Sequence, residues 1–354
     1  MAFFSYNNIR IAGISASVPR AVRYIKDMEC FAPGEGEKVI ALTQAEEARI
    51  APAEMCASDL CCTAAEKLIS DLNWNKNEIE VLVFVSFSRD YYLQPNTCGL
   101  IQTRLGLPTT CMALDIPFPC AGYLYGLNVV ASMLEQGTVK KALLLDGETC
   151  TKCHSLLDKE LGPLLGDAGT ATAIEYYKDA NPIHINLYTD GTGADWLAAD
   201  EGGCRHPATP ESFKMIEEKP GVIRNKLHVR MRDGMSVFSF STKEPVIGIK
   251  DLCSLHNIDL KEIDFLYLHQ ANKMICDRIA KKLGVPLKKV PYSLMKFGNP
   301  ASVSVPLTMV YATREDLSSR NVKAMLCAFG GGLAWGSAYI VFDKIVCPEI
   351  IEVD

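Results

Sequence analysis

Cys120 stands at a position where a protein chain readily activates a thiol, the start of a helix. The stretch PCAGYLYGLNVVASMLEQG, residues 119–137, predicts a helix from about Ala121, because Leu124 and Leu127 begin an apolar pattern with helical spacing. A helix start carries unpaired N–H groups and the positive end of the helix dipole, and both favour a thiolate. We therefore expect the pKa of Cys120 to lie below the ~8.5 of a free thiol. The alternative is a small buried side chain without a chemical role, as most cysteines are.

The order of strands and helices is repeated in the second half of the chain, which indicates an internal duplication of a βαβαββ unit. The pair IE at 79–80 precedes one buried strand as the pair ID at 263–264 precedes another. We assign residues 1–187 to an N-terminal half and residues 188–354 to a C-terminal half. The segment from about 188 to 232 has no counterpart in the first half and is predicted to be an insertion that carries loops.

This duplication brings polar residues of both halves toward one place. His269 ends a buried strand in the sequence KEIDFLYLHQ, and Asn299 precedes a predicted helix, as Cys120 does in the first half. Helices that alternate with apolar strands imply sheets that are mainly parallel and covered by helices. Ligands of such sheets bind beyond the carboxyl ends of the strands. The sequence therefore predicts that a thiol, an imidazole and an amide meet there.

Two further segments carry expectations about local structure. Residues 20–50 are charged and lack a clear period, so they are expected to be irregular. The segment KKVPYSLM, residues 288–295, is expected to be a strand of the second half.

Four motifs, in this order along the chain, resemble the condensing enzymes of the thiolase superfamily. They are PCAG (119–122), HQAN (269–272), GNPAS (298–302) and FGGGLAWGSA (329–338). The likeness is greatest to β-ketoacyl-[acyl-carrier-protein] synthase III and its relatives, and it extends from about residue 9 to 343. The resemblance implies an α/β fold of two thiolase-like βαβαββ halves, layered α-β-α-β-α.

The resemblance also implies a catalytic triad of Cys120, His269 and Asn299. Cys120 would hold the acyl group of a thioester, and backbone N–H groups of Cys120 and Gly331 would form the oxyanion hole. His269 and Asn299 would hydrogen-bond a malonyl thioester, whose decarboxylation gives the enolate for a Claisen condensation. Phe329 would keep water from the acyl-enzyme. The implied pathway is fatty acid or polyketide-type biosynthesis, with no cofactor besides the thioester carriers.

The identity of the thioester carrier is left open by the sequence. The segment TQAEEAR, residues 43–49, is acidic where the family has a basic segment linked to coenzyme A. A predicted helix carries the basic residues Lys273, Arg278, Lys281 and Lys282, which we interpret as a docking surface for an acidic acyl carrier protein. A solvated helix face is the alternative interpretation of these charges. The resemblance further implies a homodimer, with the loop at Tyr91-Tyr92-Leu93 closing the partner's acyl pocket.

Other functions are also compatible with parts of the sequence. A thiolase-fold acyltransferase would pass the acyl group of Cys120 to an oxygen or nitrogen nucleophile. The segment Cys150-Thr151-Lys152-Cys153-His154 fits the pattern C-x-x-C-H of covalent haem attachment, and it could instead hold zinc together with Cys204 or His206. We expect no metal site, because haem attachment of this kind normally follows export and the zinc pattern lacks a second ligand pair.

Composition restricts the class of protein and its surroundings. A net charge of −6 over 354 residues argues against a protein that binds nucleic acid. The 14 cysteines lie largely in apolar periodic segments, as is typical of reduced thiols in a cytoplasmic protein. Neither a signal peptide nor an apolar run long enough to span a membrane is evident in the sequence. We therefore expect a cytoplasmic enzyme that does not act at a membrane.

Overall fold

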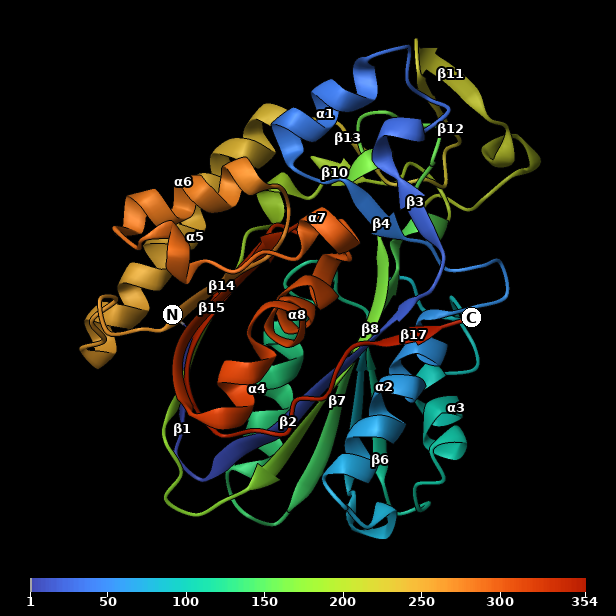
Figure 1. Ribbon diagram of the computed structural model, residues 1–354. Helices are drawn as coiled ribbons and strands as arrows, with labels where there is room; N and C mark the ends of the chain where they lie inside the picture. The colour runs from blue at the N-terminus through green and yellow to red at the C-terminus, as the bar shows by residue number, and fades with distance from the viewer. Residues whose placement is uncertain (1) are drawn as a thin grey trace.

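Two mixed β-sheets face each other in the computed structural model, which describes residues 2–354 (Figure 1). The six-stranded sheet has the order β17 (Ile351–Val353), β2 (Ile9–Pro19), β8 (Asp167–Tyr176), β7 (Lys141–Thr149), β5 (Val81–Val85) and β6 (Met112–Ile116). The five-stranded sheet has the order β1 (Ala2–Tyr6), β9 (Ile183–Thr189), β16 (Ala334–Asp343), β15 (Asn321–Gly330) and β14 (Phe265–Leu268). β9 thus pairs with β16 from the C-terminal part of the chain, and β1 joins the same sheet by pairing with β9.

Helices fill the space between the sheets and cover their outer faces. The helices α4 (Gly122–Leu134) and α8 (Ser304–Ser319) contact strands of both sheets and form the middle layer. The six-stranded sheet is covered by α2 (Ala57–Asp71) and α3 (Thr97–Arg104), and the five-stranded sheet by α5 (Gly234–His256), on which α6 (Lys273–Leu283) packs. The layered α-β-α-β-α architecture of a thiolase-like fold is therefore confirmed.

The middle helix α4 shows why this sequence adopts this layer. Leu124, Leu127, Val130 and Leu134 are fully buried, and with residues of both sheets they form the largest apolar cluster. A helix that packs between two sheets needs apolar residues over most of its circumference, and in α4 only the side with Tyr125, Val129, Ser132 and Met133 is partly or fully exposed. The predicted start near Ala121 agrees with the observed start at Gly122. The same packing fixes the position of the residues that precede the helix.

The expectation of mainly parallel sheets is wrong for the five-stranded sheet. Only β14 and β15 pair in parallel there, whereas β1, β9, β16 and β15 pair antiparallel. The reason is the tight turn between β15 and β16, which joins Gly330 to Ala334 and can only connect antiparallel strands. The six-stranded sheet combines three parallel pairings with two antiparallel ones, which flank β8.

Both local expectations also need correction. Residues 288–295 form no strand; the 3₁₀ turn η7 (Leu287–Lys289) and the short helix α7 (Leu294–Phe297) occupy this segment. Pro291 has no N–H for a strand ladder, and the N–H of Ser293 donates to the side chain of Gln270 at 3.1 Å. Residues 20–50 are more regular than expected.

The segment 20–50 contains a helix and a short strand pair. The helix is α1 (Glu35–Thr43), and the pair consists of β3 (Val22–Tyr24) and β4 (Glu47–Arg49). Only Gly36 of α1 is buried, so the helix lacks the apolar stripe on which a sequence-based prediction depends.

The predicted insertion lies over the carboxyl ends of the strands. It contains the pair β10 (Leu197–Ala198) and β13 (Arg230–Met231) and the hairpin of β11 (Ile216–Lys219) and β12 (Val222–Arg224). Arg224, 6% exposed, anchors this hairpin through ion pairs to Asp158 at 2.9 Å and Glu218 at 2.7 Å. No helix among residues 2–354 has both the length and the apolar character needed to cross a membrane.

Candidate active site

Cys120 lies in the tight connection between β6 and α4. The N–H of Gly122 donates to the carbonyl of Pro119 at 2.6 Å, which turns the chain directly into the helix. The sulfur rests against Gly330 at the end of β15, where a Cβ atom would lie only 2.5 Å from Sγ. A glycine is therefore required at position 330, because any side chain there would occupy the space of the nucleophile.

Two backbone N–H groups near the sulfur of Cys120 lower the pKa of its thiol. One belongs to Cys120 itself and the other to Gly331, in the turn that follows β15. Donors that are fixed by the fold need no reorganisation when charge develops, which is the requirement for an oxyanion hole. They converge beside the sulfur, where the carbonyl oxygen of an acyl group on Cys120 would lie.

The pKa of Cys120 moves in the direction opposite to the one expected from the helix start. Burial raises the pKa of the thiol to about 11, and the negative charge of Glu148 adds to this effect. The two backbone N–H groups lower the pKa only in part. The predicted thiolate is thus wrong for the free enzyme, in which the nucleophile is a neutral thiol at physiological pH.

His269 follows β14 and is held from several sides. The backbone N–H of His269 donates to the carbonyl of Cys327 at 2.9 Å. The ring of Phe329 meets the imidazole edge-on, with 5.3 Å between the ring centroids. The side chain is only 2% exposed, and burial lowers the pKa of His269 to about 4. The imidazole is therefore neutral, and one ring nitrogen carries the proton while the other accepts.

Ser304 is the hydrogen-bond partner of Nδ1 of His269. Its Oγ lies 2.8 Å from Nδ1 of His269 and accepts a hydrogen bond from the N–H of Gln270 at 3.3 Å. We assign the hydroxyl proton of Ser304 to the contact with Nδ1, which puts the imidazole proton on Nε2. This leaves an N–H donor on the side of the ring opposite Ser304. The sequence analysis did not single out Ser304, although it stands only two residues after the end of the GNPAS motif.

Asn299 is oriented in a comparable way by its own loop. Its side-chain oxygen accepts from the N–H of Ala301 at 3.0 Å, so its NH₂ group is the part left to bind a substrate. Its backbone N–H donates to the carbonyl of Leu164 at 2.6 Å. Gly298 precedes it with φ of +61°, and a Cβ atom there would lie 2.8 Å from the same carbonyl oxygen. The loop at 162–166 thus supports the position of Asn299.

These groups line one cavity of about 310 Å³. The five predicted site residues Cys120, His269, Asn299, Phe329 and Gly331 all contribute to its wall. The rest of the wall is largely apolar, with leucines of the segment 161–165 and side chains of α5. A thiol next to fixed N–H groups, opposite two further donors, can hold an acyl group and stabilise an enolate beside it.

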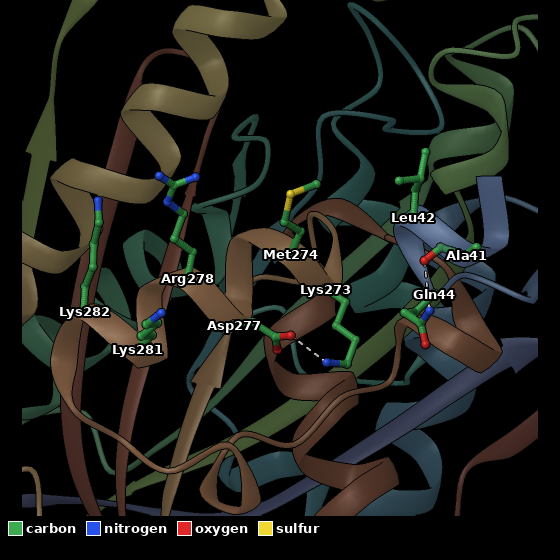
Figure 2. Close-up of a pocket in the computed structure, with 9 residues that line it drawn as sticks. All are labelled: Ala41, Leu42, Gln44, Lys273, Met274, Asp277, Arg278, Lys281 and Lys282. Carbon is green, nitrogen blue, oxygen red and sulfur yellow. Dashed lines mark hydrogen bonds and ion pairs between the residues drawn. The ribbon is translucent and has the colours of Figure 1, made fainter. Parts of the chain in front are cut away.

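The predicted docking residues lie in a separate groove of about 940 Å³ between α6 and α1 (Figure 2). Lys273 is paired with Asp277 at 2.7 Å, and Lys282 donates to the carbonyl of Thr242 at 2.6 Å. Within residues 2–354, Arg278 and Lys281 form no ion pair and are exposed. The groove adjoins the cavity, because Asn272 lines the cavity and the next residue lines the groove.

The C-x-x-C-H segment also contributes to the cavity. Cys150 and His154 line it, and Nδ1 of His154 lies 2.8 Å from the carbonyl oxygen of Cys150. Nowhere between residues 2 and 354 do three or more His, Cys, Asp or Glu side chains come together as ligands for a metal ion. The structure thus offers no ligand set for the zinc site that the sequence left open, and Cys204 is exposed on the insertion.

Comparison with known proteins gives the same family from both parts of the chain. A family model of 3-oxoacyl-[acyl-carrier-protein] synthase III matches residues 114–191, and the model of its C-terminal part matches residues 253–342. A β-ketoacyl-[acyl-carrier-protein] synthase III of Chlamydia caviae is 32% identical over 337 residues, covering 94% of this chain and 97% of the relative. The crystal structure of a 3-oxoacyl-(acyl-carrier protein) synthase from Burkholderia xenovorans has a TM-score of 0.92 at 29% identity, with 99% of each chain covered.

Proposed function

The chain belongs to the 3-oxoacyl-[acyl-carrier-protein] synthase III family of condensing enzymes, and from this membership we propose that it joins an acyl group on Cys120 to a malonyl thioester. The observation that carries this proposal is the pair of N–H groups on the Cys120 sulfur, in one cavity with His269 and Asn299. The reaction uses the residues of the chain and two thioesters, without a further cofactor.

Acylation is the first step of the proposed reaction. The sulfur of Cys120 attacks the carbonyl carbon of the acyl thioester, and the N–H groups of Cys120 and Gly331 stabilise the oxyanion. The carrier sulfur leaves, and the released carrier thiol takes the proton that Cys120 loses. Because the thiol of Cys120 is neutral before the reaction, its proton must move as the new bond forms.

Decarboxylation and condensation form the second step. Nε2–H of His269 and the NH₂ group of Asn299 donate to the thioester oxygen of the malonyl group, where negative charge develops as carbon dioxide leaves. The enolate carbon attacks the acyl carbon, and the Cys120 sulfur leaves and takes up one proton. The product is a β-ketoacyl thioester on the second carrier.

We assign the groove on α6 to the carrier of the malonyl group, an acyl carrier protein. Arg278 and Lys281 support this assignment, because they are exposed cations without an ion pair in the described chain and line the groove that adjoins the cavity. Carrier proteins of this kind are acidic, so opposite charge would guide their approach. On the α1 side the groove is lined by Ala41, Leu42 and Gln44, none of which is a cation that would bind the phosphates of coenzyme A.

A homodimer is proposed from the exposed apolar loop after β5. Tyr91, Tyr92 and Leu93 are 46%, 77% and 77% exposed, which is unfavourable for a single chain in water. Light scattering at working concentration should give twice the mass of one chain. A single-chain mass would contradict the proposed dimer.

One experiment tests the proposed reaction as a whole. The purified chain is incubated with a set of acyl thioesters, and intact-protein mass spectrometry identifies the acyl group that it acquires. Malonyl-acyl carrier protein is then added, and release of the acyl group as a β-ketoacyl product is measured. Transfer of the acyl group to an added alcohol or amine instead, without decarboxylation, would contradict condensation and favour an acyltransferase. Cys120→Ala is the control and should remain unacylated.

A further inference from the structure

The cavity contains a histidine that the proposed reaction does not use. His154 belongs to the C-x-x-C-H segment, whose 3₁₀ turn η3 (Cys150–Lys152) directly follows β7. Cys150, Cys120 and Phe87 pack together, and the ring of Phe87 meets the imidazole of His154 edge-on at 6.4 Å between centroids. His154 and Cys120 thus line the same cavity, linked along its wall by Cys150 and Phe87.

The hydrogen bond of His154 fixes the state of its ring. A carbonyl oxygen can only accept, so Nδ1 must carry the proton that it donates to Cys150 at 2.8 Å. Burial lowers the pKa of His154 to about 4, so the ring is neutral and Nε2 is a bare acceptor. Within residues 2–354 no hydrogen bond reaches Nε2. A ligand that displaces water from Nε2 must supply a donor in its place or leave this acceptor unpaired.

A second polar group in the cavity wall is also without a partner. Ser241 on α5 is 2% exposed and lines the cavity, and in the part of the chain that the structure describes its hydroxyl makes no hydrogen bond. Most of the surrounding wall consists of apolar side chains such as Leu161, Leu165 and Phe240. A plain alkyl chain in this cavity would displace water from both polar groups and offer them no hydrogen bond in return. A cavity for such a chain therefore needs neither group.

We propose that His154 accepts a hydrogen bond from a hydroxyl group on the acyl chain carried by Cys120, so that the cavity selects hydroxyacyl over plain alkyl groups. Ser241 lines the same cavity and can hydrogen-bond a further polar group of the ligand. This inference rests on the proposed function, because it concerns the acyl group that Cys120 acquires. On this proposal, the histidine of the C-x-x-C-H segment helps to determine which acyl groups the enzyme accepts.

The test compares matched pairs of acyl thioesters. In each pair one member carries a hydroxyl where the other carries a methyl group, at successive positions along the chain. The rate of Cys120 acylation is followed by intact-protein mass spectrometry. For at least one position the hydroxyl member should react about tenfold faster, as expected for one buried hydrogen bond.

Variants separate recognition from a general defect. His154→Leu removes the acceptor and should abolish the preference, so that the two members of each pair acylate Cys120 at equal rates. His154→Gln can still present an acceptor and should keep part of the preference. His228→Leu is the matched control: His228 lines a neighbouring pocket, its Nδ1 accepts from Asn225 at 3.1 Å, and the preference should persist without it.

The outcomes distinguish failure of this inference from failure of the proposed function. Equal rates for both members of every pair, or a preference that survives in His154→Leu, would overturn the inference while acetyl transfer still supports the proposed function. Failure of every thioester, acetyl included, to acylate Cys120 would overturn the proposed function and this inference with it.

Discussion

Individual side chains in this site are held in their neutral forms by burial. The pKa of Cys120 is raised to about 11 and that of His269 is lowered to about 4, so an ion pair between them is disfavoured before substrate binds. Activation must then come from the oxyanion hole during attack rather than from a preformed thiolate. This distinguishes the site from cysteine enzymes that store a thiolate at a helix start.

Alkylation of Cys120 should therefore depend steeply on pH. The reactive thiolate fraction of a thiol with a pKa of about 11 grows roughly tenfold for each pH unit between 7 and 10. The rate with iodoacetamide, read at the peptide that contains Cys120, should rise throughout this range. Peptide mapping separates it from the exposed Cys204. A rate that levels off near neutral pH would contradict the neutral thiol.

Replacing Asn299 should separate the two half-reactions. Asn299→Ala removes a donor to the malonyl oxygen and should slow decarboxylation about 10²–10³-fold, while Cys120 still acquires an acyl group. Asn299→Asp is the matched variant, because it keeps an acceptor for the N–H of Ala301 and lacks the NH₂ group. Near wild-type condensation in both variants would remove Asn299 from the mechanism.

Ser304 should act on the reaction only through the tautomer of His269. Ser304→Ala removes the hydroxyl that lies 2.8 Å from Nδ1, so the ring proton is no longer restricted to Nε2. Decarboxylation should fall about tenfold and acylation should be little changed. Nitrogen-15 NMR of the imidazole should show a shift from the Nε2–H form toward a mixture. An unchanged spectrum would mean that Ser304 does not set the tautomer.

At the scale of elements, a buried carboxylate joins three segments beneath the site. Glu148, near the end of β7, accepts from the N–H groups of Phe87 at 3.0 Å and Ser88 at 3.1 Å, which follow β5. Ser302, in the loop that carries Asn299, donates its hydroxyl proton to Asp146 on the same strand at 2.6 Å, and its oxygen lies 3.3 Å from Glu148. This network holds the strand ends and the loop in register.

Glu148 should make stability depend on pH in a defined direction. Burial raises its pKa to about 7, above the ~4.3 of an exposed glutamate, so the folded state binds the proton more tightly than the unfolded state. This contribution is fully present below pH ~4.3 and is lost as pH rises through about 7, at a cost on the order of a few kcal/mol.

Urea unfolding of Glu148→Gln between pH 5 and 8 tests this dependence. The variant has no proton to lose, so its free energy of unfolding should fall less over this range than that of the wild type. Glu211→Gln, in an exposed ion pair with Lys214, is the control and should keep the wild-type slope. Parallel slopes for the wild type and Glu148→Gln would contradict the raised pKa.

Sequence patterns predicted those elements that bury regular apolar stripes. The buried strand β5 and the middle helix α4 follow from their apolar residues, and the duplication predicted that Cys120, His269 and Asn299 would meet. The helix α1 escaped prediction because it is largely exposed. Contacts between distant loops, such as that of Ser304 with His269, have no periodic signal, and the depth of burial that raises the pKa of Cys120 cannot be read from spacing.

For the whole molecule, the cavity and the groove on α6 place two substrates on one side of the chain. The acyl group enters the cavity of about 310 Å³, and the proposed carrier protein rests on the larger groove outside it. Asn272 caps α6 by accepting from the N–H of Ile275 at 2.9 Å, and it also lines the cavity. The start of α6 thus forms the border between the two.

Charge reversal in this groove should weaken binding of the carrier protein alone. Lys281→Glu should raise KM for malonyl-acyl carrier protein about tenfold at low salt, and less at high salt, because the attraction is screened. KM for a small malonyl thioester analogue should not change. Lys178→Glu, exposed after β8 and outside the groove, is the control. Equal effects on both substrates would point to damage at the cavity instead.

The contact between Gly330 and the Cys120 sulfur has a consequence for how related chains are judged. A relative can keep the cysteine, the histidine and the asparagine and still be unable to seat its nucleophile, if a methyl group occupies the position of Gly330. One nucleotide change suffices to turn glycine into alanine. A duplicated gene of this fold could thus lose catalysis by a change at this glycine and still encode the folded protein. A check of the three triad residues alone would not detect the loss.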